Sequence, residues 1–445
     1  MIKIRLPTGA EQILNKLDEN GYAAYVVGGC VRDSLLGIKP KDWDICTSAT
    51  PSQIKEVFTD SKTIDTGIKH GTITVVIDDE HYEITTFRID GEYSDCRRPD
   101  SVEFVSDIEQ DLARRDFTIN ALAYRPGFLL DLNGGANHLK SKKITCVGNP
   151  DDRFNEDALR IMRALRFASV YGFEIDSNTS EAIHRNAHPL NKIAVERINT
   201  ELCKLLRGKG VLQILLDYSD VFSVVLPEIK PCIGFDQNNK YHCFTVYEHI
   251  AHAVANYPGA DISVKLALLL HDIGKPTCYS EDENGGHFYG HGVPSADIAE
   301  QALKRLRFDS VTQQEVTELV LYHDSIIEPT SKTIRRWLNK VGEKQFARLL
   351  DIRKADILAH TEGTQQERID KCTRINEVFS NILAEDQCFS LKKLNLRGRD
   401  LIEIGLPEGE KIGEILRVVL NKVIEGELEN ERDILVQYVR EVYVC

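Results

Sequence analysis

The sequence predicts an α+β fold, with an α/β unit over residues 1–148 followed by an all-α remainder. Three observations support this prediction. Helical and strand patterns alternate along the first unit. From Arg153 onward, apolar residues recur at helical spacing to the end of the chain. Finally, 445 residues with 42% hydrophobic and 28% charged side chains are typical of a globular protein but too many for one core, so we expect several domains.

Apolar spacing predicts the elements of the first unit in order. Helical spacing is found at 11–19 and again at 31–37. Strands are predicted where apolar residues are continuous or alternate with polar ones, at 23–27, 72–78 and 81–87. The last two runs flank a short polar turn, which predicts a β-hairpin.

The composition excludes several classes of protein. A formal charge of −14, from 69 acidic and 55 basic residues, argues against non-specific coating of nucleic acid but permits a local basic groove. No apolar run reaches the roughly 18 residues that span a bilayer, and the first residues do not resemble a signal peptide. The 11 cysteines are scattered without C-x-x-C pairs, as in a protein with reduced thiols. We expect a cytoplasmic protein with no membrane partner and no obligate protein partner.

Two carboxylates follow a glycine pair in the first unit. Gly28 and Gly29 lie where a strand enters a helix, so their unhindered amides can receive phosphate oxygens. Asp42 and Asp44 come next in an extended segment, where residues i and i+2 project on one face. Such a pair suits two Mg²⁺ ions, and Glu83 on the polar face of the hairpin is a possible third carboxylate. Taken alone, the D-x-D pattern is also common in acidic surface loops.

A basic motif, RRDFTINALAY (114–124), follows the hairpin. Arg114, Arg115 and Asp116 stand just ahead of a predicted amphipathic helix that carries Asn120. Arginine suits polyphosphate because its planar donors stay charged and bind oxygens in pairs. Without this context, an Arg-Arg pair usually belongs to a solvated surface.

Six segments in order resemble the motifs of the class II tRNA nucleotidyltransferases, the CCA-adding enzymes. This family also contains the bacterial poly(A) polymerases and the separate CC-adding and A-adding enzymes. The segments are GGCVRDSLLG (28–37), KDWDICTSATP (41–51), RRDFTINALAY (114–124), DLNGGANHL (131–139), EDALRIMRALRFA (156–168) and ERINTEL (196–202).

The resemblance implies a DNA polymerase β-like nucleotidyltransferase head at 1–148 and a helical neck at 149–235. It implies that Asp42 and Asp44 are the catalytic carboxylates that bind Mg²⁺. The implied activity is template-independent addition of CCA to the 3′ end of tRNA from CTP and ATP. The implied nucleotide-binding residues are Gly28, Gly29, Arg32, Arg114, Asp116, Asn120, Asp157, Arg160 and Arg163.

Asp157 and Arg160 offer a way for protein to select the base. They are i and i+3 on a predicted helix, so their side chains are expected to meet. Cytosine and adenine both present an amino donor beside a ring-nitrogen acceptor, which matches an accepting carboxylate and a donating guanidinium. Uracil and guanine present the opposite pattern. The resemblance assigns this pair the templating role; the simpler alternative is a helical salt bridge.

A polar, basic segment at 90–104 joins the hairpin to the RRD motif. It resembles the flexible loop that reshapes the family's pocket between C and A addition, so it favours an enzyme able to add A. On its residues alone it is an ordinary loop.

A second set of metal-ligating residues occurs in the helical remainder. His271 and Asp272 end an apolar helix, and further histidines and an aspartate lie on other predicted helices: His249, His291, His323 and Asp356. Imidazole and carboxylate ligands from several helices suit Mn, Ni, Fe or Co, or Mg through the carboxylates.

This series resembles the HD superfamily of metal-dependent phosphohydrolases. The resemblance implies that His249, His271, Asp272 and Asp356 bind a second divalent metal, with His291 and His323 as second-metal or phosphate contacts. It also implies an HD-type helical body at 236–384 that hydrolyses phosphate esters, such as 2′,3′-cyclic phosphates of damaged RNA ends. Alternatively, an HD fold can lose catalysis and serve only to hold RNA.

The C-terminal segment at 385–445 resembles the family's helical tail, which binds tRNA. The implied RNA contacts are Lys392, Lys393, Arg397 and Arg399, although the same residues fit a solvated helical face. Two alternatives to CCA addition stay open within the family: an A-adding enzyme and a poly(A) polymerase. From another class, the chain could act mainly as an HD phosphohydrolase.

Overall fold

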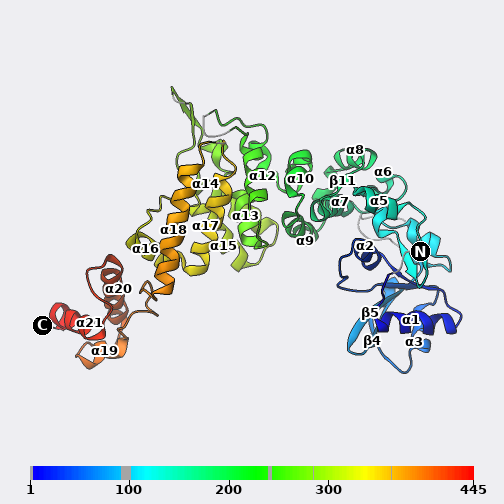
Figure 1. Cartoon of the computed structure of the whole chain (residues 1–445), viewed down its shortest axis with the longest axis horizontal. Helices are drawn as coiled ribbons and strands as arrows, with labels where there is room; N and C mark the ends of the chain where they lie inside the picture. Colours follow the sequence, from blue (N-terminus) through cyan, green and yellow to red (C-terminus); the bar gives the residue numbers. More distant parts are fainter. Residues whose placement is uncertain (1–3, 92–101, 239–242, 284, 362, 445) are drawn as a thin grey trace. The chain divides into compact units, whose positions relative to one another are not determined.

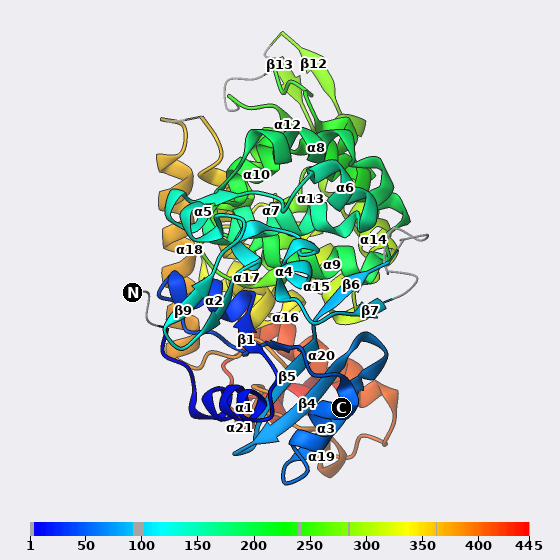
Figure 2. The same cartoon turned by 90° about the vertical axis from the view of Figure 1, so that its right-hand side faces the viewer.

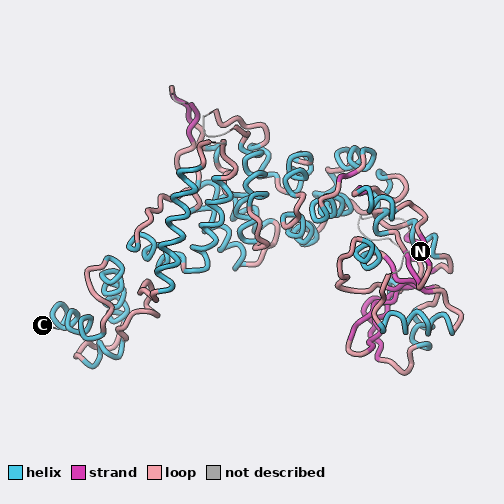
Figure 3. Tube along the Cα trace, viewed as in Figure 1, coloured by secondary structure: helices cyan, strands magenta, loops and turns pink. Residues whose placement is uncertain are grey.

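The computed structural model describes residues 4–91, 102–238, 243–283, 285–361 and 363–444. The chain forms two compact units, Met1–Pro227 and Glu228–Cys445. Figure 1 and Figure 2 show the elements of each, and Figure 3 shows that strands gather in the first unit while the second is almost entirely helical. The predicted α+β fold is confirmed. Within the described ranges, none of the helices is long and apolar enough to cross a membrane.

A seven-stranded sheet organises the N-terminal part of the first unit, in the order β3-β4-β5-β2-β1-β8-β9. β2 and β5 are parallel, and the other neighbours are antiparallel. The strands are β1 (Ala24–Val27), β2 (Ile45–Thr47), β3 (Lys62–Gly67), β4 (Thr72–Ile77), β5 (Glu80–Thr86), β8 (Ala123–Arg125) and β9 (Phe128–Leu130). A separate ribbon pairs β6 (Arg88–Asp90) with β7 (Val102–Phe104). The helices here are α1 (Thr8–Glu19), α2 (Gly29–Leu35), α3 (Pro51–Val57), α4 (Ile108–Ala113) and α5 (Gly135–Ser141), with short 3₁₀ helices at Ile68–His70 and Thr118–Asn120.

The expected strand at 23–27 and the expected hairpin are both present, as β1 and β4–β5. In β5, Tyr82 and Ile84 are buried and Glu83 between them is exposed, as the alternation predicts. One face of β5 is therefore buried and apolar, and its opposite face carries Glu83.

The expected amphipathic helix carrying Asn120 is wrong. Thr118–Asn120 is one turn of 3₁₀ helix, and the chain then enters β8. The apolar side chains from Phe117 to Tyr124 are all buried, so no face of this segment is available for solvent. A short apolar run of this kind suits a central strand as well as a helix, and spacing does not distinguish them.

Helices follow the sheet within the first unit. They are α6 (Pro150–Glu156), α7 (Leu159–Tyr171), α8 (Ser177–Arg185), α9 (Val195–Leu206), α10 (Val211–Asp217) and α11 (Ser219–Val225), with a 3₁₀ helix at His188–Lys192 and the strand pair β10 (Lys143–Ile144) and β11 (Glu174–Ile175). α7 packs on α9. At their C-terminal ends a Cβ on Gly208 would lie 2.1 Å from the Ser169 Oγ, so only glycine allows this close approach.

The second unit is built on α13, whose residues Ser263 to Leu270 are all buried. α12, α15 and α17 pack against it. The helices of the unit are α12 (Val246–Asn256), α13 (Ile262–Leu270), α14 (Gly292–Arg305), α15 (Ser310–Tyr322), α16 (Ser331–Val341), α17 (Glu343–Ile357), α18 (Gln366–Ala384), α19 (Gly398–Glu403), α20 (Glu410–Glu425) and α21 (Arg432–Val439). Short 3₁₀ helices lie at Pro227–Cys232 and Lys275–Thr277, a π turn at Arg440–Val444, and a hairpin joins β12 (Ser280–Asp282) to β13 (Gly285–His287). The last three α-helices share a small core of their own. The division into head, neck, body and tail stays a prediction.

Candidate active sites

Three carboxylates meet on the polar face of the sheet. Asp42 and Asp44 lie in the segment immediately before β2, which begins at Ile45, and not within the strand itself. Ile45 pairs with Ile84 in the parallel β2–β5 ladder, so Asp44 stands beside Glu83. Both isoleucines are buried, which places the two carboxylates together on the opposite, exposed face. The structure thus brings together the predicted pair and the possible third carboxylate.

The electrostatics of this group favour a bound cation. Partial desolvation, followed by repulsion from Asp42 and Glu83, raises the pKa of Asp44 to about 6, although Arg115 opposes the shift. Carboxylate oxygens are the hard ligands that Mg²⁺ prefers. The residues present therefore fit a divalent ion.

Arg115 lies beside the glycine turn and acts electrostatically on Asp44. Gly28 has φ 73°, and a Cβ on it would lie 2.9 Å from the Arg115 Nη1. Arg115 is held by Asp111, 3.2 Å from its Nη2, and donates to the Asn120 carbonyl at 3.3 Å. The sequence-based site list included Arg114 but missed Arg115, although both belong to the same RRD motif. Arg114 pairs with Asp111 at 2.7 Å and donates to the Arg88 carbonyl.

Four predicted nucleotide-binding residues form one chain of hydrogen bonds. Arg32 donates to the Asn120 Oδ1 at 2.6 Å, and the Asn120 Nδ2 donates to the Asp116 Oδ1 at 3.0 Å. The other oxygen of Asp116 accepts from the Arg163 Nε at 2.8 Å. Burial alone would raise the pKa of Asp116, but Arg163 and Asn120 lower it to about 2. Asp116 is therefore a fixed anion that joins the 3₁₀ helix at Thr118–Asn120 to α7.

Aromatic rings support the same chain. The Arg32 guanidinium lies 5.0 Å from the ring centres of both Phe167 and Tyr171, and the Tyr171 hydroxyl donates to Asp33 at 2.9 Å. These contacts tie α2 to α7.

The expected contact between Asp157 and Arg160 along one helix is wrong. Asp157 lies between α6 and α7 with φ −143° and ψ 102°, because its Oδ1 accepts from the Leu159 N–H and caps the start of α7. Its Oδ2 is 2.8 Å from the Arg197 Nη2. Arg160 instead pairs with Glu156 at 2.5 Å and donates to the Arg114 carbonyl at 3.1 Å. The predicted list missed Arg197 and Glu156, although both lie in the quoted ERINTEL and EDALR segments.

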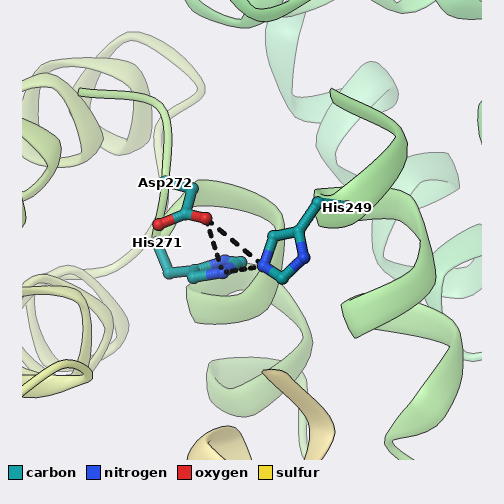
Figure 4. Close-up of side chains that lie close together, drawn as sticks. All are labelled: His249, His271 and Asp272. Carbon is teal, nitrogen blue, oxygen red and sulfur yellow. Dashed lines mark hydrogen bonds and ion pairs between the residues drawn. The ribbon is translucent and has the colours of Figure 1, made fainter. Parts of the chain in front are cut away.

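The predicted HD ligands converge in the second unit. Figure 4 shows three of them, His249, His271 and Asp272. His249 comes from α12, His271 and Asp272 follow α13, and Asp356 lies on α17. The His249 Nε2 is 2.9 Å from the Asp356 Oδ1, 3.3 Å from the Asp272 Oδ2 and 3.4 Å from the His271 Nε2. The His271 Nε2 is also 3.3 Å from the Asp272 Oδ2.

The two further histidines face the other oxygen of Asp272. Its Oδ1 is 3.1 Å from the His291 Nε2 and 3.6 Å from the His323 Nε2, and these two nitrogens are 3.0 Å apart. His360, which the predicted list missed, also joins the cluster through Asp356 and His249. The i, i+4 spacing of Asp356 and His360 was the available signal. We call these seven residues the HD cluster.

The chemistry of the HD cluster fits a transition-metal ion. Every histidine in it has its Nδ1 within 3.2 Å of a backbone carbonyl, which leaves the Nε2 atoms to converge. Burial disfavours a charged His271, yet Asp272 and Asp356 raise its pKa to about 10. The cluster thus requires positive charge at its centre.

The predicted RNA-binding residues differ in their surroundings. Lys392 and Arg399 are exposed. Arg397 donates to three backbone carbonyls of its own segment, and Lys393 pairs with Asp386 at 2.6 Å. The loop expected to reshape the pocket falls largely on residues 92–101, outside the described residues.

Three family models match the chain. They are "Poly A polymerase head domain" at 24–145, "Probable RNA and SrmB- binding site of polymerase A" at 172–233, and "tRNA nucleotidyltransferase domain 2 putative" at 292–439. The first covers the sheet with its carboxylates, and the second begins directly after α7.

Relatives match along nearly the full length. The chain is 35% identical to the CCA-adding enzyme of Ligilactobacillus salivarius, over 96% of this chain and 94% of the relative. It is also 35% identical to the CCA-adding enzyme of Leuconostoc mesenteroides, over 97% and 96%. The crystal structure of the Bacillus stearothermophilus CCA-adding enzyme in complex with CTP is 31% identical, with a TM-score of 0.72 over 97% of this chain and 96% of that one. The Thermotoga maritima CCA-adding enzyme complexed with tRNA, at 21% identity and a TM-score of 0.61, shares the fold. Because it is 35% identical to two of these enzymes over nearly its full length, the chain belongs to the CCA-adding enzyme family of tRNA nucleotidyltransferases.

Proposed function

We propose that this protein adds CCA to the 3′ end of tRNA, using CTP and ATP and no nucleic-acid template. The main support for the proposal is the 35% identity to CCA-adding enzymes over nearly the full length of the chain. In the reaction, the 3′ oxygen of the RNA forms a bond to the α-phosphorus of the incoming nucleotide as the bond to pyrophosphate breaks. A cytoplasmic location is part of the proposal, because tRNA and nucleoside triphosphates are present there.

Asp42 and Asp44 are proposed to hold Mg²⁺, with Glu83 beside them. Bound Mg²⁺ would neutralise the triphosphate and favour the ionised 3′ hydroxyl. Arg115, which lies against Gly28 and acts on Asp44, is placed to bind a phosphate oxygen. Because Asp111 holds its guanidinium, Arg115 offers its donors in a fixed direction.

Asp157 and Arg160 are proposed to select the base. Glu156 and Arg197 hold these two side chains apart from each other, so each can address a different group on the base edge. The Asp157 carboxylate would accept from the amino group of cytosine or adenine, and Arg160 would donate to the ring nitrogen. Uracil and guanine would instead place a carbonyl oxygen against the Asp157 carboxylate and an N–H against Arg160, so acceptor would meet acceptor and donor would meet donor, which is costly.

Three tRNA transcripts test the proposal, ending at the discriminator base, at C and at CC. Each is incubated with CTP and ATP, singly and together, and the products are sequenced. We expect CCA to be completed on all three. Addition of A to the CC end alone would indicate an A-adding enzyme instead, and long A tails would indicate a poly(A) polymerase. Charge reversal at the exposed Lys392 and Arg399 is expected to weaken tRNA binding without changing the added sequence.

We further propose that the HD cluster hydrolyses phosphate esters. The convergence of four imidazole Nε2 atoms and two carboxylates, with His360 beside them, favours this second activity. A divalent metal held there by His249, His271, Asp272 and Asp356 would supply a nucleophilic water. Metal analysis and a phosphodiesterase assay with 2′,3′-cyclic nucleotides and several divalent ions test it. If the protein contained no metal and hydrolysed no ester, the HD cluster would be a structural element only.

A further inference from the structure

Asp356 is the most exposed of the four predicted HD ligands. The side chain of Asp356 is 15% exposed, whereas those of His249 and His271 are fully buried and that of Asp272 is 2% exposed. A substrate that enters from solvent therefore meets Asp356 first among these four residues.

Arg368 lies next to Asp356. It lies in the first turn of α18, its side chain is 41% exposed, and its Nη2 is 3.7 Å from the Asp356 Oδ2. The other oxygen of Asp356 faces inward, 2.9 Å from the His249 Nε2. Asp356 thus separates the guanidinium of Arg368 from the centre of the HD cluster. At 3.7 Å the contact is too long for a hydrogen bond, so an incoming anion can engage the guanidinium at little cost.

Another cationic side chain beside the HD cluster, Lys275, already has partners within the protein. Lys275 is buried, and its Nζ lies 2.7 Å from the Asp272 Oδ2 and donates to the Gln237 Oε1 at 2.9 Å. Lys275 is thus engaged by one ion pair and one hydrogen bond. Arg368, in contrast, is 41% exposed and lies beside the most exposed of the four predicted ligands.

We propose that Arg368 binds the non-bridging oxygens of a phosphate ester as it enters the HD cluster, and that this contact selects anionic phosphate ends as substrates. The inference rests on the proposed phosphohydrolase function of the same cluster. A planar guanidinium suits the role because it can donate two parallel hydrogen bonds to a phosphate, which a lysine ammonium does not reproduce. The substrate class is a phosphate mono- or diester whose phosphorus lies at an accessible end, such as the terminus of an RNA.

Three variants test the inference in the full-length, metal-loaded protein: Arg368→Ala, Arg368→Lys and the control Arg374→Ala, an exposed arginine of the same helix. The measurements are metal content, binding of inorganic phosphate by calorimetry, and KM and kcat for a 2′,3′-cyclic nucleotide. Loss of a charge-assisted contact is expected to weaken phosphate binding and raise KM by about tenfold or more in Arg368→Ala. Arg368→Lys should recover part of the loss. Metal content should not change, and Arg374→Ala should behave as wild type.

Three results would overturn the inference. Unchanged phosphate binding and KM in Arg368→Ala would show that the arginine does not contact substrate, while the phosphohydrolase function stood. Lost metal in Arg368→Ala would show that it acts by orienting Asp356. If the wild-type protein neither binds phosphate nor hydrolyses the ester, the phosphohydrolase function itself fails and takes the inference with it.

Discussion

At the residue scale, Asp44 carries an electrostatic cost that the protein retains for function. Its neighbours Asp42 and Glu83 are both anionic, and together with desolvation they raise its pKa to about 6 from 3.8. The folded state therefore binds more protons than the unfolded state between these values. Stability from this group is fully present below pH 3.8 and is lost as the pH rises through 6.

The Asp44→Asn variant should consequently be more stable than wild type at pH 8 in EDTA, because the substitution removes the repulsion. We expect a gain of at most about 1 kcal/mol, since the carboxylate is exposed and solvent screens it. The gain should vanish near pH 4 and shrink at pH 8 when Mg²⁺ is added. Urea unfolding at the two pH values measures it; a variant less stable than wild type at pH 8 in EDTA would contradict the electrostatic account.

Arg160→Ala should loosen base selection. With the donor to the ring nitrogen removed, discrimination against UTP and GTP should fall by about tenfold or more. Misincorporation on a tRNA ending at the discriminator base provides the measurement. Arg207→Ala, an exposed arginine at the end of α9, is the matched control. Selectivity that is unchanged in Arg160→Ala would remove Arg160 from the templating role.

The residue types of the site could be predicted, but not all of their contacts. The exposed side of Glu83 was predictable because strand alternation decides which side chains share a face, and the D-x-D pattern pointed to Asp42 and Asp44. The partners of Asp157 could not be predicted. Its carboxylate accepts a hydrogen bond at the start of α7 and pairs with Arg197, and helical spacing alone does not indicate either contact.

At the element scale, periodicity predicted the long helices and the β4–β5 hairpin but failed where a segment is buried on all sides. The segment from Phe117 to Tyr124 has no polar face, so a 3₁₀ turn followed by β8 satisfies its burial as well as a helix would. The predicted ligands His249, His271, Asp272 and Asp356 come from α12, from the residues that follow α13 and from α17, and only tertiary packing brings them together.

The close approach of α9 to α7 gives a stability prediction. A Cβ on Gly208 would lie 2.1 Å from the Ser169 Oγ and 2.5 Å from its carbonyl carbon, so Gly208→Ala must push the helices apart. We expect a loss of about 1–3 kcal/mol, as for an overpacked core. Gly413→Ala, in α20 with open space around it, should be neutral or stabilising by about 0.5–1 kcal/mol. Shifts in the urea midpoint compare the two; equal effects would contradict the packing argument.

At the scale of the whole molecule, the two candidate sites draw their ligands from different units. The carboxylates of the sheet belong to Met1–Pro227, and the HD cluster belongs to Glu228–Cys445. Their residues also favour different ions, because one set is all oxygen and the other is rich in imidazole.

The two activities should therefore be separable by single substitutions. Asp42→Ala should abolish nucleotide addition and leave ester hydrolysis unchanged, whereas His271→Ala should do the reverse. Both activities are assayed in both variants, with metal content as the check on the HD cluster. Loss of both activities in a variant that keeps its thermal midpoint would argue against independent sites.

The most direct test of the central claim is to sequence the 3′ ends of a tRNA that lacks CCA, after incubation with CTP, ATP and Mg²⁺ and either wild-type protein or Asp44→Asn. The account predicts that wild type adds C, C and A and stops, and that Asp44→Asn, which stays folded, adds nothing. Unextended tRNA with wild-type protein, or full CCA with the variant, would contradict it.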